Sequence, residues 1–509
     1  GGSGGSGEAA SPEVAPRSLR EVADAAPVCM SASTRQLAFA CLERLAAVSP
    51  ATRLAVLRAV LPHHTSPPAA LGEEAGSLDT DSMGRLLPRA FAGRAGLRNL
   101  GSTCYMNSTL QQLFMIPAFR RALLAAEPAC VRDGLAPDLS DATPGERVLL
   151  QLQRLFVRLE ASHLQSVDPT SFVTSFSTWE GPVDVTVQQD ASEFLGQFFE
   201  HLQSALAGSP HAQGLVGAVR GQLCHELEAE AEAEVDEVGA GEGAGAGEAG
   251  AGTQRFASSR EEPFYFLTVG VKHRRTLEES LRHFVEAETV DYTWEGKGGQ
   301  RLRLPTHKRC SLGALPPHLI VHLKRFEFDL TNLTQVKVND RFEFPHELDL
   351  WPYTRQGLAA QAAGGEGGGL GGEGGEGGGA SDAAALYRLR GVVLHHGAAH
   401  AGHYYSYIQE RAEDVGRAGG DLPHAGGDSS SSSGGGGGGG AVGVGADGAV
   451  WLEFNDRTVR LFDARDLDAD AFGGSGEDGE DGYGGGTRGR ERTANAFLLV
   501  YDRVVGGEG

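Results

Sequence analysis

One cysteine in this chain lies in a setting that suits a nucleophile. Cys104 follows a glycine-rich segment that begins at Gly96, and the pattern after it predicts an amphipathic helix that Pro117 ends. A thiol at a helix N-terminus meets unpaired N–H groups and the positive end of the helix dipole, and both favour the thiolate. A buried structural cysteine is the alternative for any isolated thiol. Cys104 is therefore a candidate nucleophile, with that alternative open.

A thiolate nucleophile needs a base, and one group of histidines supplies candidates. Residues 387–407 read as a strand, a short glycine-bearing turn and a second strand. The histidines in this segment are His395, His396, His400 and His403. They also suggest a metal, but no cysteine or carboxylate cluster stands near them to complete a site, and each alone could be a solvated loop residue. His403 is the best placed base, because Gly402 and an aromatic strand flank it.

A third segment could hold the base in place. Trp451, Glu453 and Asn455 alternate along a predicted strand and so share one face, with Asp456 directly after it. A thiolate–imidazole pair needs a group that holds the ring by its other nitrogen, and asparagine or aspartate can serve. Alone, an Asn-Asp pair is common in turns. Taken together, the three segments predict a Cys–His–Asn site.

These residues need a scaffold with two kinds of element. Helical periodicity dominates from Tyr105 to about Leu206, and strand-like runs dominate afterwards. The predicted strands cover residues 264–271, 318–328, 387–395, 403–408, 450–454 and 496–501. Helices first and strands later predict an α+β fold with two lobes, not a doubly wound parallel sheet.

The chain divides into a short first part and a long second part. Residues 1–88 read as a flexible linker and a short helical extension, which is either the end of a helical-repeat array or a segment packed on the main domain. The main domain is expected over residues 89–505. Its Gly-, Glu- or Ser-rich insertions, which we expect to be disordered, lie near residues 228–258, 356–383, 411–448 and 472–490.

Composition limits the partners and the compartment. With 44 basic and 67 acidic residues the formal charge is −23, which argues against nucleic acid or an anionic membrane as partner. No apolar run is long enough to span a bilayer. The 6 cysteines are scattered without a CxxC pair, which indicates reduced thiols. We therefore expect an intracellular protein of the cytoplasm, or of the nucleus as well.

The motifs strongly resemble those of the ubiquitin-specific protease family. Residues 96–108 match the family's cysteine box, Gly-Leu-x-Asn-x-Gly-x-Thr-Cys-Tyr-x-Asn-Ser, at every fixed position. The other segments that match in the correct order are 188–194, 318–326, 391–397, 402–404, 454–459 and 496–501. Residues 111–117 and 342–350 further resemble the large members, which carry helical repeats before the catalytic domain.

The resemblance implies a papain-like fold with thumb, palm and fingers, and a thiol hydrolase that cleaves (iso)peptide bonds after the C-terminal glycine of ubiquitin. In the family's mechanism, His403 takes the proton of Cys104, and Asn455 orients His403. Asn99 matches the donor to the oxyanion, and Asp456 matches an acid that assists or replaces Asn455. A catalytically silent ubiquitin-binding scaffold and an isopeptidase for another ubiquitin-like modifier stay open as alternatives.

The resemblance also assigns residues to the tail of ubiquitin, which ends Leu-Arg-Leu-Arg-Gly-Gly, and implies ubiquitin and ubiquitinated proteins as partners. The residues at matching substrate-binding positions are Asp190, Glu193, Gln189, Tyr404, Phe326 and His395. Asp190 and Glu193 lie three apart on a predicted helix, so they share a face that could bind the basic tail or simply be solvated. Core packing is the alternative for Phe326.

In many family members, zinc bound by two CxxC pairs holds the tips of the fingers together. This chain departs from that pattern. Residues 294–297 stand in place of the second pair and contain no thiol, and the first pair retains at most Cys224. Four ligands cannot be assembled from these positions, so we expect no zinc and no other cofactor.

Overall fold

The computed structural model describes the chain in several ranges. They are residues 41–42, 44–46, 48–49, 51–56, 94–127, 142–161, 164–179, 181–209, 211–232, 253–296, 300–364, 385–411, 449–474 and 492–504. The chain forms two compact units, of which the first is Gly1–His63 with Cys130–Asp141 and the second is His64–Ala129 with Ala142–Gly509. In the first unit the described residues are helical on both sides of Ser49, whose hydroxyl accepts the Thr52 amide at 3.1 Å and caps the helix that follows.

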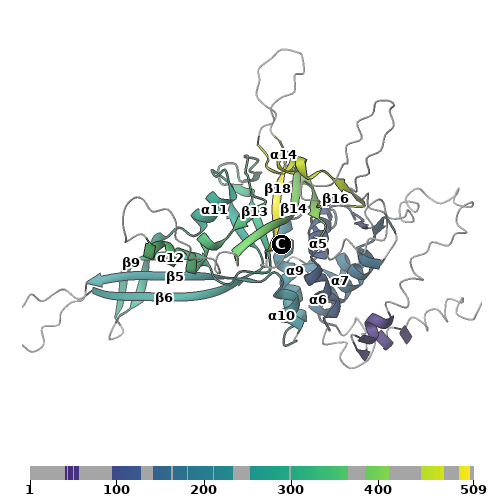
Figure 1. Ribbon diagram of the computed structural model, residues 1–509, viewed down its shortest axis with the longest axis horizontal. Coiled ribbons are helices and arrows are strands. Elements are labelled where there is room, and N and C mark those ends of the chain that lie inside the picture. The colour runs from purple at the N-terminus through teal and green to yellow at the C-terminus, as the bar shows by residue number, and fades with distance from the viewer. Residues whose placement is uncertain are drawn as a thin grey trace, which may run out of the picture. The chain divides into compact units, whose positions relative to one another are not determined.

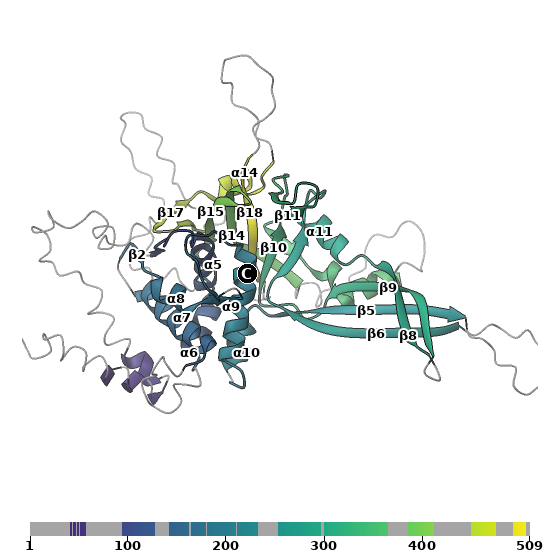
Figure 2. The same cartoon turned by 180° about the vertical axis from the view of Figure 1, so that it is seen from behind.

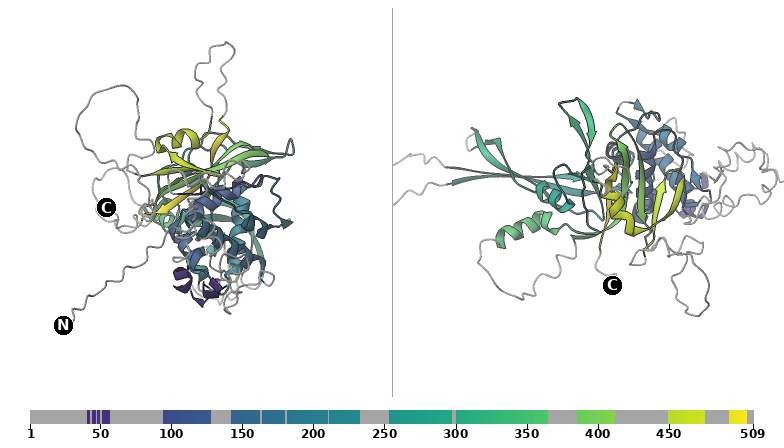
Figure 3. Two further views of the ribbon diagram at one scale, coloured as in Figure 1. Left: turned by 90° about the vertical axis from the view of Figure 1, so that its right-hand side faces the viewer. Right: turned by 90° about the horizontal axis from the view of Figure 1, so that it is seen from above.

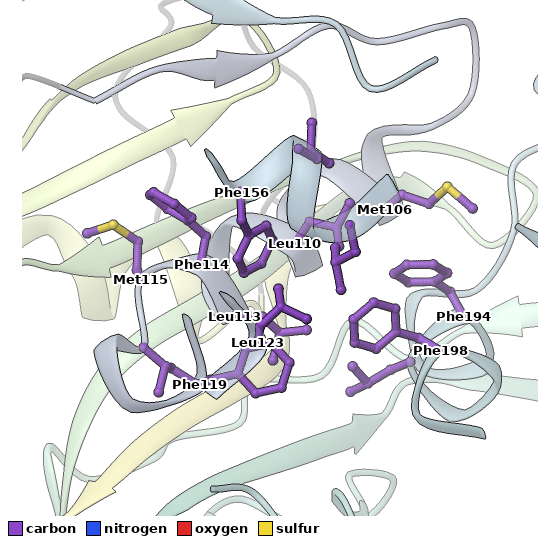
Figure 4. Packing of buried hydrophobic residues seen from close by; sticks show 14 of the residues in the cluster. Met106, Leu110, Leu113, Phe114, Met115, Phe119, Leu123, Phe156, Phe194 and Phe198 are labelled. Carbon is purple, nitrogen blue, oxygen red and sulfur yellow. The ribbon is translucent and has the colours of Figure 1, made fainter. Parts of the chain in front are cut away.

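The second unit opens with a helical part (Figure 1). Its helices are α5 (Cys104–Phe114), α6 (Pro117–Ala125), α7 (Pro144–Ala161), α8 (Thr170–Ser175), α9 (Ala191–Ala205) and α10 (His211–Val216). Every residue of α5 is buried, and its polar side chains find backbone partners: Gln111 donates to the Ala95 carbonyl at 2.9 Å and Gln112 to that of Tyr407 at 3.3 Å. Phenylalanines from α6, α7 and α9 pack around α5 (Figure 4), so the helix that begins at Cys104 is held firmly in the core.

A sheet of eight strands covers the other side of α5, in the order β17-β16-β15-β14-β18-β10-β7 with β13 beside β14 (Figure 2). The strands are β7 (Leu267–Gly270), β10 (His318–Lys324), β13 (Glu347–Asp349), β14 (Leu386–Ala398), β15 (Ala401–Gln409), β16 (Trp451–Asn455), β17 (Thr458–Phe462) and β18 (Ala494–Arg503). Neighbours are antiparallel except β10 and β7. Two hairpins, β14–β15 and β16–β17, bring the predicted histidine and asparagine to one end of this sheet.

Smaller elements surround this core. They are β1 (Gly96–Leu97), β2 (Ser166–Val167), β3 (Ser177–Thr178), β4 (Gly181–Pro182), β11 (Phe326–Asp329), β12 (Thr334–Lys337), α11 (Leu277–Phe284), α12 (Arg355–Gly364), α14 (Leu467–Ala471) and the 3₁₀ turns Trp351–Tyr353 and Ala464–Asp466. The order of elements, helices first and strands later, confirms the predicted α+β class.

A second sheet projects from the unit as long strands (Figures 1 and 3). Its order is β6-β5-β9-β8, with β5 (Gly221–Glu232), β6 (Thr253–Phe264), β8 (Glu288–Glu295) and β9 (Arg301–Leu312). Near its end Trp294 is buried, packs on Phe256 with ring centroids 5.6 Å apart, and donates to the Thr306 hydroxyl at 2.9 Å. This apolar cluster occupies the place where the resemblance aligns a metal-binding pair. Within the described ranges no three His, Cys, Asp or Glu side chains form a metal-binding group.

The predicted disordered insertions extend too far, because residues at their ends are ordered in the structure. Residues 228–232 and 253–258 belong to paired strands, because alternate residues such as Ala229 and Phe256 turn to the apolar face while glutamates stay exposed. Residues 356–364 continue α12, whose alanines favour a helix. Residues 472–474 are also placed: the Gly474 amide donates to the Asn339 carbonyl at 2.8 Å.

Several expectations lie outside the described residues. These are the disorder of residues 233–252, 365–384, 412–448 and 475–491, and the linker over residues 1–40 and 57–93. In the part that the structure covers, no helix is both long and apolar enough to cross a membrane. The cysteines in that part, Cys41, Cys104, Cys224 and Cys310, are all free thiols.

Candidate active site

Cys104 is the first residue of α5 and is buried, at 3% exposure. The loop before it is held by one side chain: the Asn99 Oδ1 accepts from the amides of Gly101 (3.0 Å) and Thr103 (3.2 Å). Gly101 has a φ of 141°, and a Cβ there would clash with the Val185 carbonyl oxygen, so only glycine fits this turn. The glycine-rich segment thus fixes the candidate nucleophile, Cys104, at the helix N-terminus.

His403 lies on β15 and faces both predicted partners. Its Nε2 lies 2.8 Å from the Asn455 Oδ1 on β16. A hydrogen bond with Cys104 raises the pKa of His403 to about 9; burial opposes this, while the Asn455 bond and the charges of Cys104 and Asp456 add to it. The structure therefore brings Cys104, His403 and Asn455 together in an arrangement that favours the protonated imidazolium of His403.

Asn455 is itself oriented by a buried carboxylate. Its Nδ2 donates to the Glu453 Oε1 at 3.3 Å, and Glu453, only 5% exposed, pairs with Arg460 at 2.6 Å. Because the two residues are two apart on one strand, they share a face, as the sequence pattern predicts. The amide nitrogen is thereby assigned to Glu453, which leaves the oxygen to accept from the histidine ring.

Asp456 links the helical part to the sheet. It lies in the tight turn between β16 and β17 with a φ of 47°. Its Oδ1 accepts from Asn107 at 2.8 Å and its Oδ2 from Asn99 at 2.9 Å, and Oδ2 lies 4.0 Å from the His403 Nε2. A single carboxylate therefore positions two amides next to the Cys104 loop and helix and lies near the ring of His403.

Gln188 is a residue of the site that the sequence did not single out. Its Oε1 accepts the Gly402 amide at 2.7 Å, and its Nε2 lies 4.0 Å from the Cys104 Sγ. In the sequence its one signal is its place in the segment 188–194, where the resemblance assigns substrate binding to the next residue, Gln189. Gln189 turns to α5, where its Oε1 accepts from the Tyr105 hydroxyl at 3.3 Å.

The two predicted acidic residues have different surroundings. Asp190 is the N-cap of α9: its Oδ1 accepts the Ser192 amide at 2.6 Å and the Ser192 hydroxyl at 2.7 Å. Glu193, in the first turn, is exposed and accepts from Gln197 at 3.2 Å. Asp190 is therefore not a solvated face residue, whereas Glu193 is open to solvent.

The predicted aromatic residues form one cluster under the β14–β15 hairpin. His395 lies 4.6 Å from Tyr404 and 5.1 Å from Phe326, between ring centroids, and both His395 and Tyr404 are 1% exposed. Burial lowers the pKa of His395 to about 3, helped by the charges of Lys337, His396 and His403, so its ring is neutral. Phe326 both packs in this cluster and lines an open hollow of about 950 Å³ next to β11 and β12.

A lysine that the sequence does not single out, Lys337, stabilises the turn of this hairpin. The Lys337 Nζ donates to the carbonyls of Thr493 (2.6 Å), His395 (2.8 Å) and Gly397 (3.3 Å). No short motif reveals such a contact, because its partners are backbone atoms of distant strands.

The α+β architecture and the geometry around Cys104 are those of papain-like cysteine proteases. Residues 95–501 match the family model described as ubiquitin carboxyl-terminal hydrolase. This chain belongs to that family.

Named relatives agree with this assignment. The chain is 30% identical over 498 residues to human ubiquitin carboxyl-terminal hydrolase 24, covering 94% of this chain and 16% of the relative. It is 30% identical over 370 residues to mouse ubiquitin carboxyl-terminal hydrolase 9X, covering 64% and 13%. With fission-yeast ubiquitin carboxyl-terminal hydrolase 15 it shares 28% identity over 415 residues, covering 81% and 28%. The chain thus spans less than a third of the length of each of these relatives.

Proposed function

We propose that this chain is a deubiquitinating enzyme, a thiol-dependent hydrolase that cleaves the peptide or isopeptide bond after the C-terminal glycine of ubiquitin. The observation that carries the proposal is the contact of His403 with both Cys104 and Asn455 in a member of this family. A silent scaffold would have no use for a base whose raised pKa depends on the nucleophile beside it.

The geometry supports a two-stage acyl transfer. His403 accepts the proton of Cys104, and the thiolate adds to the carbonyl carbon of the terminal glycine. An amide nitrogen carries two N–H groups, and Asp456 takes one of those on Asn99, so the other can donate to the oxyanion. His403 then gives its proton to the leaving amine, and water hydrolyses the thioester to free the enzyme.

The surroundings of the site suit a basic, narrow tail. Glu193 offers an exposed carboxylate at the start of α9, and Asp190 is fixed beside it as the cap. Gly397 and Gly402 pair across the β14–β15 hairpin, and Gly402, which directly precedes His403, carries no side chain that would narrow the approach to it. We infer that Asp190 and Glu193 bind the arginines of the tail, with Gln189, Tyr404, Phe326 and His395 shaping the channel for the last residues.

The experiment is a cleavage panel with fluorogenic C-terminal amides of ubiquitin and of other ubiquitin-like modifiers. We expect the ubiquitin substrate to be hydrolysed fastest, with no turnover by Cys104→Ala. Glu193→Gln is expected to raise KM for ubiquitin with little change in kcat, because it removes only a charge that meets the tail. Preference for another modifier would overturn the ubiquitin assignment, and tight binding of ubiquitin without turnover would favour the scaffold.

We further propose that ubiquitin and ubiquitinated proteins are the partners, with no nucleic acid or membrane, and that the protein acts in the cytoplasm or in the nucleus as well. The support for this is the formal charge of −23 and the scattered cysteines. Imaging of the tagged protein and salt-dependent binding to nucleic acid would test these two points.

A further inference from the structure

The side chain of Gln188 bridges the two halves of the site. It reaches the nucleophile through its Nε2, 4.0 Å from the Cys104 Sγ, and the strand of the base through its Oε1, 2.7 Å from the Gly402 amide nitrogen. Gly402 directly precedes His403 on β15. The same amide thus contacts the reacting sulfur and the residue next to the catalytic histidine.

The Gly402 bond decides which end of the amide faces the sulfur. A backbone N–H can only donate, so the Gln188 oxygen must point to Gly402 and the Nε2, which is a donor, must point to Cys104. Only glycine fits at position 402, because a Cβ there would clash with the His395 ring and the His396 carbonyl oxygen, so the backbone packs closely against β14. The donor is therefore aimed at the sulfur before any substrate binds.

We propose that Gln188 is a further catalytic residue, whose locked amide donates a hydrogen bond to the Cys104 thiolate. A hydrogen bond to the charged form of a group favours that form, so this donor adds to the effects of His403 and the helix N-terminus. The distance of 4.0 Å is long for the free protein, and catalytic hydrogen bonds commonly tighten once substrate is bound. This inference rests on Cys104 being the nucleophile of the proposed function.

The test distinguishes three effects at position 188: loss of the Nε2 donor, loss of the hydrogen bond to Gly402, and the addition of a negative charge. Gln188→Glu keeps an oxygen for Gly402, loses the donor and adds a negative charge. Gln188→Met has similar length and loses both contacts without adding charge. Gln203→Glu is the control: Gln203 lies on α9, the helix that follows Gln188 in the chain, and accepts from the Tyr265 hydroxyl instead. The intact chain is alkylated with iodoacetamide from pH 5 to 10, and the modification of the Cys104 peptide is followed by mass spectrometry.

We expect the midpoint of the pH dependence of alkylation to rise by about one pH unit in Gln188→Met and by more in Gln188→Glu, with Gln203→Glu unchanged. In the hydrolysis of the ubiquitin amide, kcat should fall about tenfold or more in both Gln188 variants, with KM nearly unchanged.

Three outcomes would overturn the proposal. Unchanged midpoints in both variants would show that no donor acts on the thiolate. A shift in Gln188→Glu alone would report the added charge, and a shift in Gln188→Met alone would report the Gly402 contact. Because alkylation needs no ubiquitin, a wild-type chain that alkylates at Cys104 but does not cleave ubiquitin would contradict the proposed function while the midpoints still decide the role of Gln188.

Discussion

At the scale of single residues, Asp456 connects more of the site than any other side chain described. Two asparagine amides, from Asn99 and Asn107, donate to its two carboxylate oxygens, and the base lies 4.0 Å away. Its backbone carbonyl also accepts the Leu97 amide at 2.7 Å. Besides the expected assistance to Asn455, Asp456 therefore holds the Asn99 amide, the expected donor to the oxyanion.

Replacing Asp456 with asparagine tests this. The variant should lower kcat by about 10²–10³, because an amide accepts through one oxygen only, and its NH₂ group would face one of the two asparagine amides. Asparagine tolerates the φ of 47°, so the turn should persist and the midpoint of thermal unfolding should change little. The matched control is Asp468→Asn, a surface residue paired with His346. An unchanged kcat in Asp456→Asn would exclude the role.

The pKa of His403 predicts the alkaline side of the pH–rate profile. With a folded pKa raised to about 9, the ring stays protonated up to that pH, so the proton for the leaving amine is lost as the pH rises through about 9. Asn455→Ala removes one of the hydrogen bonds that raise this pKa, and we expect the alkaline limb of kcat/KM to move to lower pH by about one unit. A limb that stays in place would show that Asn455 does not act on the ring.

Sequence patterns predicted the three side chains that the structure brings together in the candidate site, but not the contacts that support them. Cys104, His403 and Asn455 stand in short segments whose glycines and alternation indicate their setting. Gln188 and Lys337 act through contacts between segments far apart in the chain, such as the 2.7 Å bond between Gln188 and Gly402. One sequence shows no such proximity.

At the scale of elements, the meeting of β1 with the β16–β17 turn sets the site. A Cβ on Gly96 would clash with the backbone of Asp456 and Arg457, so the turn can approach the first strand only because residue 96 is glycine. The closeness of these two backbones is what brings the Asp456 carboxylate to Asn99.

Gly96→Ala should therefore destabilise the protein by about 1–3 kcal/mol and lower kcat, because the turn must shift away from Asn99. The control is Gly196→Ala in α9, where an added Cβ meets nothing within 4 Å and alanine favours the helix, so this variant should be neutral or slightly stabilised. Thermal unfolding and turnover of the ubiquitin amide are the measurements. Equal behaviour of the two variants would contradict the packing argument.

The observed elements differ from the predicted ones in two places, where composition and strand pattern alone indicate the wrong structure. The Ala/Glu stretch of β5 looks like a disordered insertion, yet its alternation buries Ala229 against Phe256. The run 318–328 was predicted as one strand, but Arg325 interrupts it between β10 and β11. Its guanidinium is buried and donates to the carbonyls of Ala496, Val338 and Asp340 at 2.6–3.1 Å, a contact that only the folded chain can show.

At the scale of the whole molecule, buried neutral histidines link stability to pH. Burial lowers the pKa of His395 to about 3 and that of His322 to about 4, from an ordinary value of 6.5. Below pH 6.5 these two histidines are protonated in the unfolded chain but stay neutral in the folded chain. The folded state is therefore destabilised progressively as the pH falls from 6.5 toward 4, and this cost is absent above pH 6.5. His403, whose pKa is raised, has the opposite dependence and loses its contribution as the pH rises.

The comparison of wild type with His395→Gln isolates one of these contributions. Between pH 7.5 and pH 5, the free energy of unfolding in urea should fall by about 2 kcal/mol more in the wild type than in the variant, at about 1.4 kcal/mol per pH unit below 6.5. Parallel pH dependences in the two proteins would show that His395 is not held neutral by the fold.

The central claim is that Cys104, activated by His403, attacks the C-terminal carbonyl of ubiquitin. The most direct measurement incubates the intact chain with ubiquitin that carries an electrophile at its C-terminus, with and without a chelator, beside Cys104→Ala and His403→Ala. We predict one covalent adduct in the wild type, located on Cys104 by mass spectrometry and unaffected by the chelator, none in Cys104→Ala and a strongly slowed one in His403→Ala. A folded wild type that binds ubiquitin but forms no adduct, or forms one on another cysteine, would contradict the claim.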